Sequence, residues 1–244
     1  MASTNTRNVV VGAAAIYLSN NDGITAPRPS TTPNDIKTLL GTTTGNSAAA
    51  QLNVSTDYRN VGLTSTGLEL NYQPTYSEVK VDQLLDAARL FKSDLKVELK
   101  TELSEATLEN LQLAWGQMDS YYNATGSSVS ALIQTDPISG EQGATLNLAA
   151  GSLGDAPVER VFIAVGNAPY TIGQKDAGTT YAGRNKERVY IARRVVSMDT
   201  TMHSLKRDAA TVFPVAFRML PDDSNASYGG SEYGVVIDRV WGTN

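Results

Sequence analysis

The segment from Asp94 to Leu103 alternates apolar and charged side chains with a period of two. In an extended chain the apolar side chains share one face, and they are Leu95, Val97, Leu99 and Leu103. The charged side chains share the opposite face, and they are Lys96, Glu98, Lys100 and Glu102. A helix would spread both sets around its axis, so the alternation predicts an antiparallel strand that buries one face and exposes the other.

Other segments rich in apolar residues lie along the chain between turns of Gly, Pro, Asn and Asp. They predict further strands at Asn8–Leu18, Leu68–Tyr72, Val129–Thr135, Ala144–Leu148, Val158–Val165, Arg188–Val196, Thr211–Leu220 and Gly234–Trp241. One amphipathic helix is expected at 105–115 after an N-cap at Ser104, and the side chains expected to pack against the sheet are Leu108, Leu111 and Trp115. Strands do not alternate with helices, which predicts a β-rich α+β fold: an antiparallel β-sandwich or partial barrel with one flanking α-helix.

The chain is expected to form one domain in three parts. Residues 1–18 form an N-terminal arm and the first strand. Residues 19–66 are poor in charge and rich in Thr, Ser, Asn, Gly and Pro. A loop of that length is uncommon inside a compact domain, so an extended insertion that contacts other subunits is expected there. Residues 67–244 supply the rest of the β domain, with the helix at 105–115.

Composition excludes several classes of function. The net charge is −5, and the longest run of basic residues is Arg193–Arg194, which argues against tight binding of nucleic acid. The chain has no cysteine and one histidine, His203, so disulfides and thiolate metal sites are excluded and a catalytic triad is unsupported. No phosphate-binding glycine motif occurs. We therefore expect no enzyme activity, and we assign no catalytic, cofactor-binding or metal-binding residue.

Several motifs occur together in a fixed order. Thr64–Pro74 leads into Val79–Gln83, and the alternating strand then runs into Leu103–Leu111. The later segments of the same pattern are Glu159–Val165, Lys186–Val196 and Leu205–Leu220. In this order and spacing the chain resembles the major tail tube proteins of long non-contractile-tailed bacteriophages, the siphophages, over about Gly67 to Val240.

The resemblance implies the tail tube fold and a structural role in the virion. Hexameric rings of the subunit would stack into a tube, and strands from each subunit would join a barrel around the lumen. The implied partners are other copies of the chain, the tape measure protein held in the lumen, and the tail terminator and tail tip proteins. Genomic DNA would pass through during ejection without specific binding. No membrane contact is implied, and the tail would assemble in the host cytoplasm.

Five polar side chains are candidates for lining the lumen, namely Glu69, Asn71, Glu78, Lys80 and Asp82. The hypothesis assumes a hairpin from Gly67 through Gln83, interrupted at Pro74. The apolar side chains expected to face the core are Leu68, Leu70, Val79 and Val81. Repetition of the carboxylates around each ring would make the bore negative, and a negative wall would not retain DNA.

Two other functions remain open. A β-sandwich carbohydrate-binding or capsid-decoration module would form a monomer or small oligomer with an exposed aromatic cluster, for which Tyr121 and Tyr122 are the candidates. A hydrolase would need converging carboxylates in a cleft. Electron microscopy distinguishes these possibilities, because only a tube subunit forms hollow tubes or rings.

Overall fold

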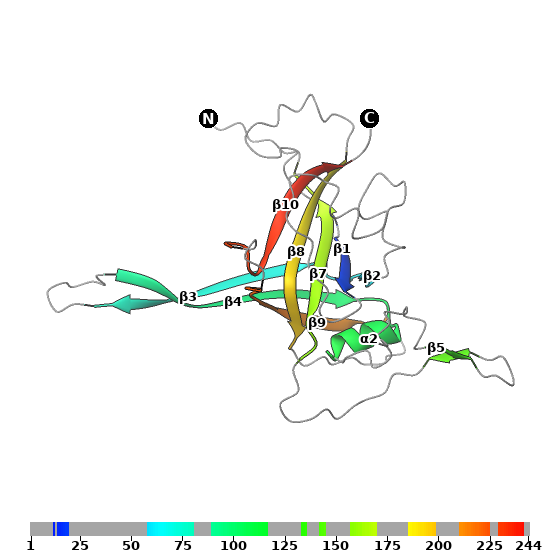
Figure 1. Ribbon diagram of the computed structural model, residues 1–244. Coiled ribbons are helices and arrows are strands. Elements are labelled where there is room, and N and C mark those ends of the chain that lie inside the picture. The colour runs from blue at the N-terminus through cyan, green and yellow to red at the C-terminus, as the bar shows by residue number, and fades with distance from the viewer. Residues whose placement is uncertain are drawn as a thin grey trace.

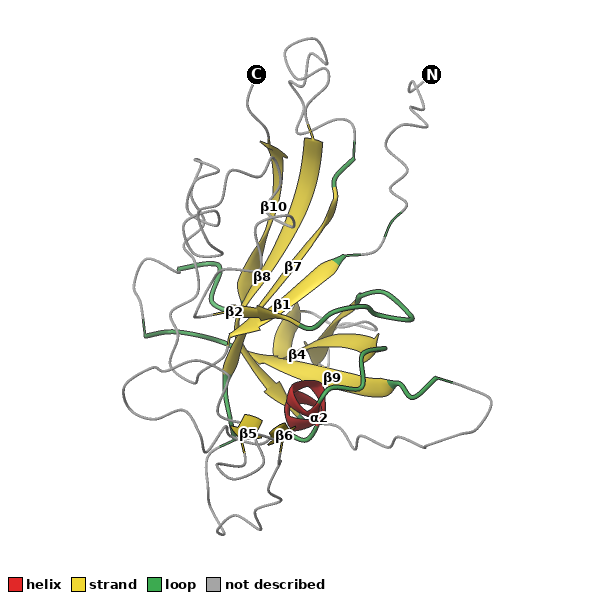
Figure 2. Cartoon of the chain, turned by 90° about the vertical axis from the view of Figure 1, so that its right-hand side faces the viewer, coloured by secondary structure: helices red, strands yellow, loops and turns green. Residues whose placement is uncertain are grey.

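The computed structural model describes Gly12 and residues 14–19, 58–80, 89–116, 133–135, 142–144, 157–169, 185–198, 210–224 and 229–241. These residues form ten strands and one helix (Figures 1 and 2). The strands are β1 (Ala15–Ser19), β2 (Tyr58–Asn60), β3 (Glu69–Val79), β4 (Arg89–Leu103), β5 (Ile133–Thr135), β6 (Gln142–Ala144), β7 (Arg160–Asn167), β8 (Asn185–Ser197), β9 (Phe213–Leu220) and β10 (Gly234–Trp241). The helix is α2 (Leu108–Ala114).

Eight of these strands form one antiparallel sheet in the order β2-β1-β7-β8-β9-β4-β3, with β10 also paired to β8. Strands β5 and β6 form a separate pair. The predicted fold class is confirmed: the chain is β-rich α+β, mostly antiparallel, with one helix in the part described, and its main sheet is open rather than closed into a barrel.

The sheet turns a corner along β8. Residues 185–192 of β8 pair with β10, whereas residues 194–197 pair with β9. Strand β7 occupies the opposite edge of β8. In Figure 1, β7, β8 and β10 therefore run up the view while β9, β4 and β3 run across it. The chain builds two crossed half-sheets from one continuous sheet, with β8 shared between them.

Arg193 lies at this corner, between the two paired stretches of β8. Its side chain is buried, and its Nε donates a hydrogen bond to the carbonyl oxygen of Ser231 at 2.9 Å. Its backbone N–H donates to the carbonyl of Tyr233 at 3.2 Å. The next residue, Gly234, has φ +153°, and a Cβ there would lie 2.1 Å from the carbonyl oxygen of Ile191. Only glycine allows β10 to approach β8 this closely.

The main core fills the space between the two half-sheets. Alternate side chains of β1, β4, β7, β8 and β9 point into it, together with one face of α2. Its large buried members include Ile16, Leu18, Leu99, Leu103, Leu113, Phe162, Val195, Phe213, Val215 and Phe217. The rings of Phe162 and Phe217 meet across the core with centroids 6.0 Å apart. The buried face of β4 is the apolar face predicted from its alternation.

The helix is shorter than predicted and begins later. Its N-cap is Thr107, whose side-chain oxygen accepts from the N–H of Asn110, and not Ser104. Ser104 does not start the helix because its N–H donates to the carbonyl of Leu63 at 2.8 Å, which continues the pairing at the end of β4. Leu113 and Ala114 are the buried apolar residues of α2. Of the three residues expected to pack, Leu111 is partly buried against the core, and Leu108 and Trp115 are half-buried.

Residues 61–67 are fastened to the end of β4. The N–H of Leu63 donates to Oε1 of Glu105 at 3.0 Å. The backbone N–H and the hydroxyl of Ser65 both donate to Glu102, to its carbonyl at 3.0 Å and to its carboxylate at 2.7 Å. Residues 58–66, which the sequence assigned to the inter-subunit loop, thus form β2 and this connection; residues 20–57 lie outside the described part.

Gly62 and Gly67 offer a matched test of this connection, because both have positive φ, +83° and +75°. A Cβ at Gly62 would lie 2.1 Å from the Glu105 carboxyl carbon, whereas a Cβ at Gly67 meets nothing within 4 Å. We expect Gly67→Ala to cost about 1–2 kcal/mol of backbone strain. Gly62→Ala should cost more, because it also displaces Glu105. Equal losses in chemical denaturation would show that the Glu105 contact contributes nothing to stability.

A second cluster lies on the other face of the half-sheet that contains β1 and β7. It consists of Tyr17, Tyr58, Val161, Ile163, Val165, Val189 and Ile191. Tyr17 is fully buried, and its hydroxyl accepts a hydrogen bond from Asn60 Nδ2 at 3.3 Å. Burial, with a smaller contribution from the charge of Glu187, raises the pKa of Tyr17 well above its ordinary value.

This shift predicts a loss of stability at alkaline pH. The unfolded chain loses the Tyr17 proton above the ordinary tyrosine pKa of 10.0, while the folded chain retains it. The stabilisation is therefore complete below pH 10 and declines as the pH rises beyond that value. We expect Tyr17→Phe to flatten the fall in melting temperature between neutral and strongly alkaline pH. An unchanged slope would contradict the assignment.

Candidate functional site

The most distinctive part of the surface is the hairpin of β3 and β4. The two strands pair from Glu69 with Lys100 to Val79 with Arg89. Strand β9 covers only residues 98–103 of β4, so the first nine residues of β4 are paired with β3 alone. We call this two-stranded segment, together with Leu70 and Asn71 at its base, the ribbon; it comprises residues 70–79 and 89–97. It projects far to one side of the body (Figure 1).

The ribbon has an apolar face that continues the core. Leu70 pairs with Leu99 and Tyr72 pairs with Val97, and both partners on β4 are buried. Directly paired residues of an antiparallel ladder project from the same face. Leu70 and Tyr72 therefore lie on the core-side face of the sheet, yet 45% and 58% of their surface is exposed. The core-side face extends beyond what the body covers.

Most of the large exposed apolar side chains are on this ribbon. Nine are found in the described part of the chain. Six belong to the ribbon, namely Leu70, Tyr72, Tyr76, Val79, Leu90 and Phe91. The remaining three are Leu63, Met198 and Val236. A concentration of this kind is unusual on a monomer, whose exposed apolar residues are ordinarily scattered singly.

The predicted lumen candidates do not share one face. β3 continues through Pro74, so the hairpin expected between Gly67 and Gln83 is wrong; the chain reverses only after Val79. Pro74 is tolerated because β3 is the last strand of the sheet. Along this single strand Glu69 and Glu78 point to opposite faces.

The positions of the other candidates follow from the same strand. Asn71 shares the face of Glu69, and Lys80 follows the strand and forms an ion pair with Glu78 at 3.4 Å. Asp82 and Val81 lie outside the described residues. Of the side chains expected to face the core, Leu68 packs partly against it, but Leu70 and Val79 are 45% and 43% exposed.

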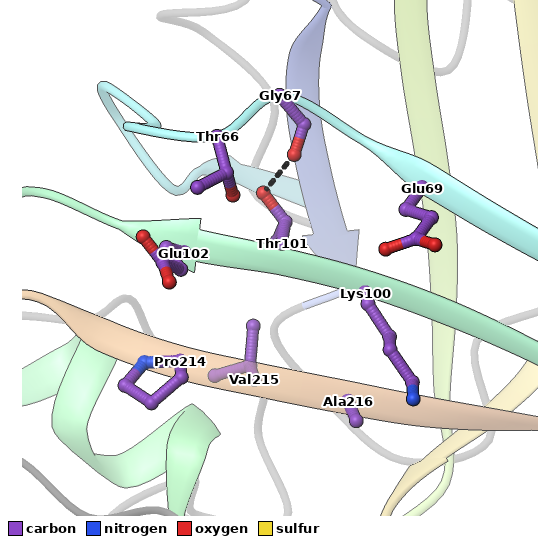
Figure 3. Close-up of a pocket in the computed structure, with 9 residues that line it drawn as sticks. All are labelled: Thr66, Gly67, Glu69, Lys100, Thr101, Glu102, Pro214, Val215 and Ala216. Atoms are coloured by element: carbon purple, nitrogen blue, oxygen red, sulfur yellow. Dashed lines mark hydrogen bonds between the residues drawn. The ribbon is translucent and has the colours of Figure 1, made fainter.

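The face of β3, β4 and β9 opposite the core-side face is called the outer face here. It carries acidic and basic side chains and has a shallow hollow of about 310 Å³ (Figure 3). Glu69, Lys100 and Glu102 line it, and the hydroxyl of Thr101 donates across it to the carbonyl of Gly67 at 2.7 Å. Cross-strand partners such as Glu69 with Lys100 have opposite charges. The charged groups of the hollow are thus two carboxylates and one ammonium, and its lining offers no nucleophile with a neighbouring base.

Within the described ranges, no group of three or more potential ligands among His, Asp and Glu could hold a metal ion. In the same ranges, no helix has the length and apolar character needed to cross a membrane. Tyr121 and Tyr122, the aromatic pair considered for carbohydrate binding, fall outside the described residues. No protein-family model and no curated protein matches this sequence.

The sequence reasoning missed the ribbon as a surface, although a pattern pointed to it. Leu90 and Phe91 are adjacent apolar residues, and adjacent residues of a strand point to opposite faces. Such a strand is either buried on both sides or offers apolar surface on both. The period-two pattern begins only at Asp94, so Leu90 and Phe91 lay outside the predicted strand and their exposure was not predicted.

Substitutions at exposed and at buried positions of the β3–β4 hairpin should differ in their effect on the free energy of unfolding. Tyr76 is 59% exposed, whereas Leu99 on the same hairpin is 2% exposed. We expect Tyr76→Ser to change the free energy of unfolding of the monomer by no more than about 0.5 kcal/mol, as surface substitutions do. Leu99→Ala should cost about 2–5 kcal/mol, as buried leucine truncations do. A large loss for Tyr76→Ser, measured by denaturation of dilute protein, would mean that the body covers the ribbon.

Proposed function

We propose that this chain is a structural subunit of a bacteriophage tail tube, with no enzyme activity, that assembles with copies of itself. The observation that carries the proposal is the uncovered apolar ribbon. Two-stranded ribbons are marginally stable alone in water, and this one leaves six large apolar side chains exposed. Contact with other subunits would cover them, and the order of motifs that resembles siphophage tail tube proteins suggests which assembly they serve.

The proposed assembly is a stack of hexameric rings in the virion tail. Its lumen would hold the tape measure protein and later conduct DNA, and its ends would meet the tail terminator and tail tip proteins. The open sheet edges at β2 and β10 fit this role, because joining edges around a ring removes them. The net charge of −5 suits a conduit that DNA passes without binding.

The strand geometry does not support a lumen wall that carries all of the candidate carboxylates. Glu69 and Glu78 project from opposite faces of β3, so at most one of them lies on a given wall. The outer face of β4 alternates acid and base, with Lys96 2.6 Å from Glu98 and Lys100 3.9 Å from it. If this face lines the lumen, its wall is polar and nearly neutral, which would also avoid holding DNA.

Negative-stain electron microscopy and sedimentation of the purified chain test the proposal. We expect rings or hollow tubes. The double variant Tyr72→Ser, Tyr76→Ser removes the aromatic part of the core-side face and should leave dispersed, folded monomers. Asp223→Ser is the control, because Asp223 is exposed on the body, outside the ribbon; it should assemble normally.

Dispersed globular particles of the unmodified chain, at concentrations where tail tube subunits must polymerise, would contradict the proposal. That outcome would favour the carbohydrate-binding or capsid-decoration module. Normal tubes from the double variant would support the tube assembly but show that the core-side aromatic residues of the ribbon are not needed for it.

A further inference from the structure

The ribbon exposes large apolar side chains on both of its faces, although the face opposite the core side is otherwise polar. The register from Tyr76 with Lys92 to Val79 with Arg89 places Leu90 opposite Glu78 and Phe91 opposite Ser77. The core-side face therefore carries four exposed side chains, Leu70, Tyr72, Tyr76 and Leu90. The outer face carries Val79 and Phe91, which are 43% and 48% exposed. A ribbon that lay on a single surface would need only one apolar face.

Within the described part, the ribbon has two free edges, and both are poorly suited to adding another strand along their length. In β3, Pro74 lacks the N–H that a ladder needs. In β4, Ser93 is an extra residue that shifts the register between Thr75 and Tyr76. Prolines and bulges are the features that prevent pairing at sheet edges. The apolar faces are therefore better suited than these edges to bind a partner.

We propose that the ribbon is a two-sided assembly arm that inserts between two other copies of this chain, with its core-side face on one neighbour and its outer face on another. This inference rests on the proposed function and specifies the contact that would build the assembly. One arm would then make two different heterologous contacts, which propagate a ring or a stack rather than close a dimer.

The size of the surface fits a neighbouring subunit. An aromatic side chain can bury 150–250 Å², so the six side chains at their exposed fractions offer roughly 600 Å². A standard interface buries about 800 Å² on each partner. Divided between two faces, each contact alone would be weak, and the repeated geometry of an assembly would strengthen both.

The body offers exposed apolar side chains that such an arm could contact. In the described part of the chain these are Leu63, Met198 and Val236. The ribbon holds two acidic residues, Glu78 and Asp94, and three basic residues, Arg89, Lys92 and Lys96, a net charge of +1. The arm therefore carries little net charge, and it meets little electrostatic repulsion from another copy of an acidic chain.

The absence of cysteine makes a direct test possible. Tyr76→Cys reports on the core-side face and Phe91→Cys on the outer face, each as the only thiol in the chain. Each variant is mixed as a small minority with unmodified protein, so that a weakened contact does not prevent assembly. Maleimide labelling is followed before and after assembly. Asp223→Cys, at an exposed turn after β9, is the control for access of the reagent.

We expect labelling at both arm positions to slow by at least about tenfold on assembly, since a covered thiol reacts only when the contact opens. The control should stay reactive. A thiol-anchored photo-crosslinker at positions 76 and 91 should then attach to two different segments of neighbouring bodies, identified by peptide mass spectrometry.

Protection at only one position, attachment of both cross-linkers to one segment, or attachment to the arm of another copy would overturn the two-sided arm. So would equal protection of the control. In each of those cases tubes still form and the proposed function stands. Failure of the unmodified protein to assemble, seen in the same preparations, would instead refute the proposed function and the arm with it.

Discussion

The architecture depends on the corner in β8. One strand serves two half-sheets because β10 and β9 follow each other along the same edge of β8, with Arg193 between the two pairings. The guanidinium holds the returning chain at Ser231, and Gly234 lets β10 come close to β8. Arg188, bidentate to Asp238 at 2.6 and 2.7 Å, then ties β8 to β10, and the carboxylate raises the pKa of the guanidinium further above its ordinary value.

The projecting ribbon follows from the unequal lengths of β9 and β4. Strand β9 has 8 residues, and only residues 213–218 pair with β4. β4 has 15 residues, so it extends beyond its support on that side. The connection of residues 61–67 to Glu102 and Glu105 fixes the other end of β4 to the body. The ribbon is thus supported at one end by a rigid base, and this support keeps its exposed side chains at defined positions.

Local pattern predicted the parts of the fold that depend on local physics. The alternation from Asp94 to Leu103 gave the buried face of β4 correctly, and the strand Gly234–Trp241 has the predicted bounds. The turn expected at Pro74 was wrong, because the missing N–H of a proline is harmless on an edge strand and no local feature shows which strand is at the edge. Sheet order, the corner and the uncovered face arise from contacts distant in sequence, which periodicity does not encode.

In the proposed assembly, an exposed apolar arm must bind another copy of the chain without binding unrelated proteins. Several features of this ribbon limit indiscriminate contact. Pro74 and the bulge interrupt the two free edges. The ammonium group of Lys92 lies 5.4 Å from the ring centroid of Tyr72 and donates a hydrogen bond to its hydroxyl at 3.1 Å. A cation over an aromatic face keeps water and charge at the centre of the apolar surface. A neighbouring copy must complement the Lys92 charge as well as the apolar groups. The contact between Lys92 and Tyr72 therefore lowers non-specific binding and raises the specificity required of a neighbour.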